Sequence, residues 1–452
     1  MNMPTADPTA ALPPLERWFQ LQAHGTTLRT ELLAGVTTFL TMAYIIFVQP
    51  AVLSACGMDF GAVMVATCLS TALATILMAL LANYPIAVAP AMGHNFFFAY
   101  AVVIGMHVPW PVALGGVAIA GIVFILTAGV GLRERLITAI PESLKFAIAA
   151  GIGLLIAMVG LQWAGIVVAA PGTLVALGHL KNPPVLLALF TLAVTAVMIG
   201  RRVRGALLWG ILASTAVGLA TGQVHYQGFV GRPPSLLPTL GKLDIAGAFA
   251  PGMVTVIFVF FLLALFDSVG TLVAVGEQAG LMRDGSLPRA RQALLADAIG
   301  TTVGAALGTS TVTAYIESGA GISVGGRTGL TSLVTAVLFL VALFLYPLVK
   351  MVGGGLAAGP TTLYPVIAPA LILVGTMMMG GLRRIPWDEP TEAVPAFLTL
   401  VMMPLTVTIT DGIAFGLTAY ALLKVTSGRA REVHPLVYVF AAVFLARYVA
   451  MG

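Results

Sequence analysis

The chain has 452 residues, of which 59% are hydrophobic and only 9% are charged, and its mean hydropathy is +1.02. Since about a quarter of the residues on a soluble surface are charged, this composition excludes a soluble fold and predicts an all-α polytopic membrane protein. The net charge of +5 is spread singly between apolar segments, which argues against a nucleic-acid partner. Cys56 and Cys68 offer no ligand set for a metal, and no metal site or cofactor is expected.

Fourteen apolar segments are long enough to be membrane-spanning helices. A cytoplasmic tail is expected over 1–28, and the first seven spans occupy 29–222, near residues 31–50, 60–82, 85–105, 110–131, 142–163, 184–200 and 205–222. After an external linker over 223–249, the second seven occupy 250–426, near residues 250–276, 289–307, 310–328, 330–350, 362–381, 392–410 and 411–426. Residues 427–452 are expected to be a cytoplasmic or interfacial segment, with an interfacial helix over 434–448.

Lys and Arg divide unequally between the two sides of this predicted topology. With Arg447 left out, seventeen fall on the side of the N-terminus and four on the other side, which are Lys181, Arg232, Lys242 and Lys350. Because cytoplasmic loops retain Lys and Arg, both termini are expected in the cytoplasm and the chain in the cell (inner) membrane.

The two halves contain corresponding interruptions, at residues 84–95 and 308–317. The first holds two prolines and a glycine, the second is a run of Thr, Ser and Val, and neither composition favours an uninterrupted helix. Pro141 and Pro365, each at the start of a predicted span, are 224 residues apart by subtraction. Because seven is an odd number, a second half of seven spans would enter the membrane from the other side, so equivalent helices of the two halves would have opposite orientations. A 7+7 inverted repeat is therefore predicted, with two broken helices that carry short extended stretches; simple proline kinks are the alternative.

Two carboxylates, Asp267 and Glu317, lie deep within apolar segments. Ionisable side chains are rare in membrane spans and mark substrate or ion pathways, so both are predicted to bind the substrate and are candidates for proton coupling. A capped structural carboxylate is the alternative for each. Asp297 lies nearer a basic loop and is expected to pair with an Arg, while Asp411 and Glu392 fit the first turns of helices.

Four further candidates for substrate contact lie at the two interruptions, and these are Asn95, His94, Phe96 and Thr311. Asn95 offers both a donor and an acceptor to a planar heterocycle, and Phe96 belongs to a run of three Phe that can stack on a flat ligand. His94 can tune the site, and Thr311 belongs to the polar run of the second interruption. The alternatives are an amide that bridges broken backbone, a His bonded to a carbonyl, and Phe rings that face lipid or core.

Six segments of the chain carry a family resemblance. They are Phe-Asp-Ser-Val-Gly-Thr-Leu-Val at 266–273, Gly-Thr-Ser-Thr-Val-Thr-Ala-Tyr-Ile-Glu-Ser at 308–318, and residues 37–48, 296–302, 325–330 and 395–399. These segments resemble the adenine/guanine/hypoxanthine permeases, a branch of the nucleobase/ascorbate transporter superfamily. The resemblance implies a dimeric, proton-coupled, elevator-type carrier, in which a core domain of spans 1–4 and 8–11 moves against a gate domain of spans 5–7 and 12–14. It also implies that Asp267 and Glu317 hydrogen-bond a purine and that Asn95 completes the site.

One stretch departs from the pattern of that family. Where the family typically has Ala-Pro-Gly-Met-Gly-Leu-Asn, this chain has Ala91 in place of a Gly and His94 in place of an apolar residue. The backbone there is less free, and the pocket gains a titratable ring beside Asn95. Guanine, hypoxanthine, adenine, xanthine and a non-purine heterocycle are therefore all open as substrates.

We expect a secondary active transporter that imports a purine nucleobase by proton symport, with an elevator-type alternating-access mechanism. The alternative is a carrier of the same fold for xanthine, uracil or an inorganic anion such as sulfate, although two carboxylates would repel an anion unless both were protonated. An enzyme is not expected, because the chain has no His-Glu-x-x-His pair. The expected partners are a small-molecule nucleobase, the lipid bilayer and a second copy of the chain in a homodimer, and the proton is the expected coupling ion.

Overall fold

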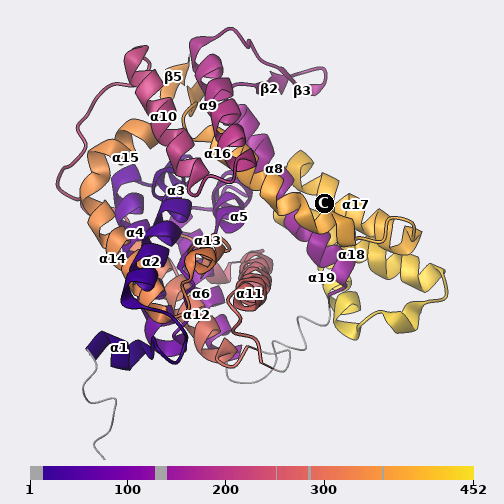
Figure 1. Cartoon of the computed structure of the whole chain (residues 1–452). Coiled ribbons are helices and arrows are strands. Elements are labelled where there is room, and N and C mark those ends of the chain that lie inside the picture. The colour runs from indigo at the N-terminus through magenta and orange to yellow at the C-terminus, as the bar shows by residue number, and fades with distance from the viewer. Residues whose placement is uncertain (1–13, 128–139, 251, 284–286, 359–360, 452) are drawn as a thin grey trace, which may run out of the picture.

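Figure 1 shows a computed structural model of the chain, which describes residues 14–127, 140–250, 252–283, 287–358 and 361–451. The described residues are mostly helical. The first part of the predicted cytoplasmic tail, the end of the predicted span 110–131, and Arg133 and Arg135 of the predicted cytoplasmic side lie outside the described residues.

The helices of the described residues follow one another through both halves of the chain. The α-helices are α1 (Pro14–Phe19), α2 (Leu28–Met42), α3 (Ile45–Ser54), α4 (Phe60–Leu77), α5 (Met92–Phe96), α6 (Trp110–Thr127), α8 (Glu142–Trp163), α9 (Pro183–Gly200), α10 (Ala206–Ala220), α11 (Met253–Gln278), α12 (Ala290–Leu307), α13 (Ser318–Val324), α14 (Gly329–Ala342), α15 (Tyr346–Gly353), α16 (Ala368–Met378), α17 (Pro390–Thr406), α18 (Ile409–Thr426) and α19 (Pro435–Met451). Two π-helices, η2 (Met78–Ala82) and η3 (Phe97–Gly105), continue α4 and α5. Short 3₁₀ turns are η4 (Gly247–Phe249), η5 (Leu343–Leu345), η6 (Met379–Arg384) and η7 (Ala430–Glu432).

Seven helical segments among the described residues are long and apolar enough to cross a membrane. They are Leu28–Ser54, Phe60–Ala82, Trp110–Thr127, Glu142–Trp163, Pro183–Gly200, Met253–Gln278 and Gly329–Gly353. Shorter apolar helices are Met92–Gly105, Ala206–Ala220 and Pro435–Ala446. The prediction of a mostly helical membrane protein is therefore confirmed at this level.

The structure also contains short strands, so the all-α prediction is incomplete. The strands are β1 (Val88–Pro90), β2 (Val167–Ala170), β3 (Leu174–Leu177), β4 (Val312–Ala314), β5 (Leu356–Ala358) and β6 (Thr361–Leu363). The pairs β2–β3 and β5–β6 are hairpins in segments that join helices, and β6 occupies the start of the predicted span 362–381. The helical part of that span is correspondingly short and consists of α16 and η6.

The two predicted interruptions meet in space as strands β1 and β4. They form an antiparallel pair in which the partners are Val88 with Ala314, Ala89 with Thr313, and Pro90 with Val312. The predicted extended stretches are therefore confirmed, and simple proline kinks are excluded. Because the two strands lie in different halves of the chain, their pairing joins the halves at one point.

A buried threonine supports the outer edge of each strand. On α4, the Thr75 hydroxyl donates to the carbonyl of Val88 and accepts from its N–H, both at 3.0 Å. On α12, the Thr301 hydroxyl donates to the carbonyl of Val312 at 2.9 Å and accepts from its N–H at 3.1 Å. Val88 and Val312 are 224 residues apart, the same separation as the two span-initial prolines. One side chain thus satisfies backbone groups that neither water nor lipid could pair.

Replacing Thr301 by Val is expected to destabilise the protein by about 2 kcal/mol, because the N–H and carbonyl of Val312 would lose their shared partner inside the protein. Thr301→Ser keeps the hydroxyl, so its loss of stability should be much smaller. The measurement is the thermal stability of the detergent-purified variants. Equal stability of the Val and Ser variants would contradict this account of the strand edge.

The described helices pack as two groups (Figure 1). Helices α2, α4, α6, α11, α12 and α14 pack around the β1–β4 pair, whereas α8, α16, α17 and α18 pack against one another. Glycines permit a close crossing in the second group, because a Cβ on Gly375 would lie 2.4 Å from the carbonyl oxygen of Gly153. The β1–β4 pair and the face of α8 therefore belong to different groups of helices.

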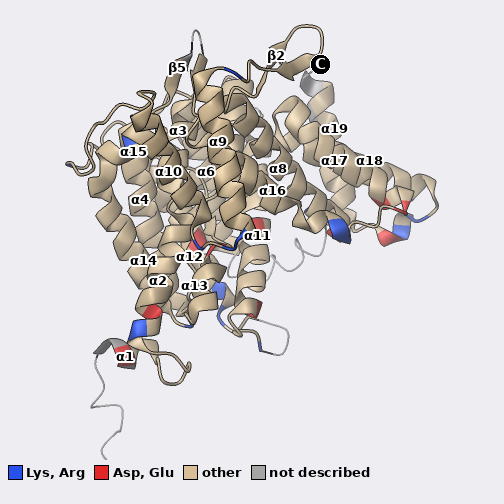
Figure 2. Ribbon diagram, turned by 45° about the horizontal axis from the view of Figure 1, so that its top comes forward, with Lys and Arg blue, Asp and Glu red and all other residues tan. Residues whose placement is uncertain are grey.

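Charged residues are few and most lie at the ends of helices in the lower part of Figure 2. On α18, the buried Lys424 Nζ lies 2.8 Å from Glu392 Oε1 in the first turn of α17 and 3.1 Å from Glu432 Oε2. Hydrogen bonds from Arg429 and Lys424 lower the pKa of Glu432 to about 2. Any stability that Glu432 contributes is therefore present above the ordinary carboxyl pKa and is lost only as the pH falls toward 2. Asp411 also lies in a first turn, as predicted.

Candidate functional site

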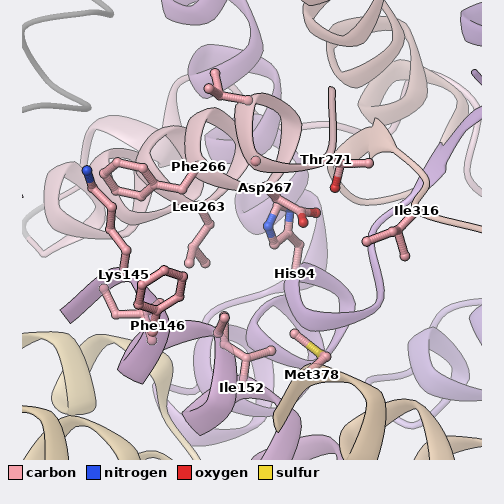
Figure 3. Close-up of a pocket in the computed structure, with 14 residues that line it drawn as sticks. His94, Lys145, Phe146, Ile152, Leu263, Phe266, Asp267, Thr271, Ile316 and Met378 are labelled. Atoms are coloured by element: carbon pink, nitrogen blue, oxygen red, sulfur yellow. The ribbon is translucent and has the colours of Figure 1, made fainter. Parts of the chain in front are cut away.

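A cavity of about 350 Å³ lies between α5 and α11 on one side and α8 and α16 on the other. Its polar lining consists of His94, Lys145, Asp267 and Thr271, and the other lining residues are apolar. Figure 3 shows Lys145 toward one end of the lining and Ile316 toward the other, with His94 and Asp267 between them. A largely apolar cavity of this size with a few polar groups is typical of a small-molecule site.

Two further cavities adjoin the first one and reach the second carboxylate. One of about 120 Å³ shares Asp267, Thr271, Ile316 and Met378 with the first and is also lined by Glu317. The other, of about 410 Å³, reaches Glu317 and Ile316 from the side of the α9–α10 loop, which carries Arg202 and Arg204. The structure therefore brings both predicted carboxylates to adjoining cavities, and both line the cavity of about 120 Å³.

Asp267 is presented to the cavity by α11 and held by β4. Its side chain is exposed although α11 lies within the helical bundle, so the exposure is to the cavity. The hydroxyl of Thr313 donates to Asp267 Oδ2 at 2.8 Å. Since Thr313 is paired with Ala89 across the two strands, the position of the carboxylate depends on the β1–β4 pair.

Glu317 follows β4 and is held by the break between α2 and α3. The hydroxyl of the buried Tyr44 donates to Glu317 Oε1 at 2.8 Å. The hydroxyl of Thr41 donates to the backbone carbonyl of Glu317 at 3.3 Å. Next to it, the Tyr315 hydroxyl donates to the carbonyl of Pro90 at 2.5 Å and so connects the segment after β4 with β1. The second carboxylate, which belongs to the second half of the chain, is thus oriented by the side chain of Tyr44 from the first half.

The sequence profile of a family described as permeases matches residues 29–415 of this chain. The chain belongs to this family. It is 47% identical to the adenine permease AdeP of Escherichia coli (strain K12), over 96% of each protein. It is 44% identical to the guanine/hypoxanthine permease PbuG of Bacillus subtilis (strain 168), over 96% of this chain and 99% of that protein. The resemblance inferred from the motifs is confirmed, and because the relatives are transporters the protein is a transporter and not an enzyme.

Solved structures with a similar fold are also transporters. The transmembrane domain of the cyanobacterial bicarbonate transporter BicA superimposes with a TM-score of 0.64 at 16% identity, covering 85% of this permease and 97% of that chain. Murine SLC26A9, an anion transporter in an inward-facing state, superimposes with a TM-score of 0.62 at 11% identity, covering 94% of this permease and 74% of that chain. At these identities the likeness shows the fold alone, which is that of a multi-pass membrane transporter.

In this permease, His94 lies on α5 and lines the 350 Å³ cavity together with Asp267. The imidazole is only 2% exposed, and its buried Nδ1 has no hydrogen-bond partner among the described residues. Buried polar atoms in proteins are usually paired. The ring lies beside the cavity, and a hydrogen bond from it to a carbonyl, which is the alternative for this residue, is not found among the described residues.

Three other predicted residues lie outside the lining of the described cavities. Asn95 is fully buried, and its Oδ1 accepts a hydrogen bond from the Ser310 hydroxyl. Thr311 is also fully buried beside β4. The ring of Phe96 is fully buried and lies 5.7 Å from the ring of Tyr100, measured between centroids. Neither the amide, nor the threonine, nor the Phe ring is brought to the cavities that Asp267 and Glu317 line.

Several residues that shape the site were not singled out from the sequence. Tyr44 and Thr41 orient Glu317, Thr313 orients Asp267, and Thr271 lines two cavities. Tyr44 and Thr41 stand in the family-like segment 37–48, which is the signal that could have pointed to them.

Asp297 of α12 also helps to position the strand β4. It is fully buried on α12, and its Oδ2 accepts a hydrogen bond from the N–H of Ala314 at 3.3 Å. Ala314 belongs to β4 and precedes the loop that carries Glu317. The carboxylate of Asp297 therefore helps to fix the end of the strand from which Glu317 is presented.

Proposed function

We propose that this permease imports a purine nucleobase, namely hypoxanthine, guanine or adenine, by secondary active transport. The observation that carries the proposal is the pair of carboxylates, Asp267 and Glu317, that line one cavity inside a membrane protein. A purine presents ring N–H and exocyclic N–H donors, and carboxylate oxygens accept such bonds. The names of two close relatives, an adenine permease and a guanine/hypoxanthine permease, support this choice of substrate class.

We further propose that the substrate is bound by Asp267, Glu317 and His94. Each carboxylate has a hydroxyl donor on one side, from Thr313 or Tyr44, and a cavity on the other. The apolar residues of the 350 Å³ cavity, which include Phe146 and Phe266, provide the surface against which a purine ring can lie. In this proposal Asn95, Thr311 and Phe96 do not contact the substrate. They stabilise the buried backbone and the packing that position the site.

The proposed architecture is fourteen spans in a 7+7 inverted repeat, with core and gate domains that move as in an elevator. The antiparallel β1–β4 pair supports it, as does the matching use of Thr75 and Thr301 on equivalent strand residues. The packing of α8, α16, α17 and α18 as a group apart from the β1–β4 pair supports a separate gate domain. A homodimer in the cell membrane with both termini cytoplasmic completes the proposal.

Proton symport is proposed because the cavities contain two carboxyl groups that can exchange a proton with water. Asp267 is exposed to the cavity, and Glu317 lines the route toward Arg202 and Arg204. A proton taken up with the base would neutralise one negative charge during the crossing of the membrane. The same two carboxylates disfavour an inorganic anion such as sulfate as the substrate.

The test is uptake of labelled hypoxanthine, guanine, adenine, xanthine and uracil in cells that lack their own permeases. Saturable purine uptake that a protonophore abolishes is the expected result. Unlabelled sulfate and bicarbonate should not compete. If no nucleobase is taken up and none competes, the proposed substrate class is wrong; if uptake survives the protonophore and requires sodium, proton coupling is wrong.

His94→Leu restores the apolar residue typical of the family and tests the contribution of the imidazole. Loss of one hydrogen bond to the substrate should lower the affinity for the preferred base about tenfold, or change the order of affinities among the competing bases. The measurement is competition for uptake by the five unlabelled nucleobases. The matched control is His225→Leu, which changes an exposed His outside the cavities. An unchanged order with unchanged affinities would exclude His94 from substrate contact.

A further inference from the structure

Four aromatic residues form a cluster at the C-terminal end of α8, and none of them lines the cavities described above. Phe96 at the end of α5 and Tyr100 on η3 are stacked on each other, with ring centroids 5.7 Å apart and an interplanar angle of 16°. Trp163 at the end of α8 and Tyr364 before α16 form a second pair, with centroids 4.3 Å apart. The N–H of Tyr364 also donates to the carbonyl of Trp163 at 2.9 Å. The first pair therefore lies on the α5–η3 segment, and the second joins the end of α8 to the segment before α16.

Few contacts join the two pairs to each other. The indole N–H of Trp163 donates to the hydroxyl of Tyr100 at 2.9 Å. The centroids of Phe96 and Trp163 are 6.4 Å apart at an interplanar angle of 51°. One hydrogen bond and one tilted ring contact thus connect the two pairs. The pairs lie on separate segments of the chain, so breaking these two contacts would let them move apart.

The cluster lies at the C-terminal end of α8, whereas the first cavity adjoins the N-terminal half of the same helix. Lys145 and Ile152 line the 350 Å³ cavity, and Trp163 lies 18 residues beyond Lys145, or about 27 Å along the helix axis. The hairpin β2–β3 follows Trp163, on the side predicted to be external. Between these ends α5 lies close to α8, because a Cβ on Gly93 would meet Ile152 Cγ2 at 2.5 Å.

We propose that Phe96, Tyr100, Trp163 and Tyr364 form the outer closure of the transport site. In the observed conformation the cluster closes the external end of the α5–α8 interface, while the cavities around Asp267 and Glu317 are lined by Lys145, Arg202 and Arg204 of the predicted cytoplasmic side. Separation of the two pairs is the step that exposes the site to the outside. This inference rests on the transport proposed above, but it does not depend on which base is carried.

The test measures access to the site from outside the cell. Ile316 is 63% exposed and lines all three cavities, so Ile316→Cys, with Cys56 and Cys68 replaced by Ala, provides a reporter. Labelling of this cysteine by a membrane-impermeant maleimide in intact cells is compared with labelling in inside-out vesicles. The parent reporter should react in the vesicles and slowly in the cells. A reporter that is unreactive in the vesicles would overturn the assignment of the open side.

Tyr100→Phe removes the bond between the two pairs and keeps the ring, and it should raise the rate of labelling from outside about fivefold. Trp163→Ala removes the ring as well and should raise the rate further. The matched control is Tyr226→Phe, at an exposed Tyr away from the cluster, which should leave the rate unchanged.

Unchanged labelling from outside in Tyr100→Phe would overturn the closure, whether or not Trp163→Ala reaches the membrane. The labelling uses no nucleobase, so its outcome is separate from that of the uptake assay. If uptake of every purine fails while Tyr100→Phe still increases access, the substrate class is wrong and the closure holds.

Discussion

Asp267→Asn and Glu317→Gln are each expected to reduce purine uptake at least about 100-fold, since a hydrogen bond to a charged group contributes up to about 3 kcal/mol. The amides keep the size of the side chains but cannot take up and release a proton. They also offer one acceptor oxygen where the carboxylates have two, and one of these already receives a bond from Thr313 or Tyr44. The measurement is initial uptake of the labelled base, normalised to the amount of protein in the membrane.

The matched control for these variants is Glu277→Gln. Glu277 lies on α11, the helix of Asp267, but it is exposed and lies outside the described cavity linings. Uptake by this variant should be close to that of the parent. Normal uptake by either Asp267→Asn or Glu317→Gln would exclude that residue from the site and from proton coupling.

The second large effect is expected at Glu31, a fully buried carboxylate at the start of α2. Its Oε1 accepts from the N–H of Arg327 at 2.9 Å, and its Oε2 accepts from the N–H of Thr331 at 3.1 Å. The hydroxyl of Thr331 also donates to Oε2 at 2.6 Å. Arg327 belongs to the loop before α14, and Thr331 lies in the first turn of that helix. The family-like segment 325–330 contains Arg327 and ends one residue before Thr331. Glu31 thus caps α14 from another part of the chain.

Glu31→Ala is expected to lower the free energy of unfolding by about 3 kcal/mol or more, because it leaves several buried N–H groups without an acceptor. Glu31→Gln keeps one acceptor oxygen, so its stability should lie between that of Glu31→Ala and that of the parent. The measurement is the loss of monodisperse protein after heating, followed by fluorescence-detected size exclusion, with Glu277→Ala as the control. Equal thermal stability of Glu31→Ala and the parent would show that water or another group replaces the carboxylate.

The places where the membrane helices break could be predicted from the sequence, because proline and β-branched runs disfavour helix locally. The same local argument identified Asp267 and Glu317, since a charge in an apolar segment is visible without any tertiary information. The register of Ala89 against Thr313 could not be predicted, because it depends on how α4 and α12 place their threonines beside the strands.

The assignment of side chains at the first break was limited for a related reason. Asn95 and Phe96 follow His94 on one short helix, and successive residues of a helix face different directions. The sequence contains no sign of which direction faces the cavity, since that depends on the contact between α5 and α8. The structure turns the imidazole of His94 to the cavity lining and the ring of Phe96 to the aromatic cluster.

The bond between Thr313 and Asp267 and the pairing of Thr313 with Ala89 connect α11, β4 and β1 mechanically. In the proposed alternating-access cycle, the ligand contacts on these elements would be carried together and would keep their geometry on both sides of the membrane. The intrinsic affinity for the base should then be nearly equal on the two sides. Net accumulation would follow from the gradient of the coupling ion, and an imposed reversal of that gradient should drive the same protein to export.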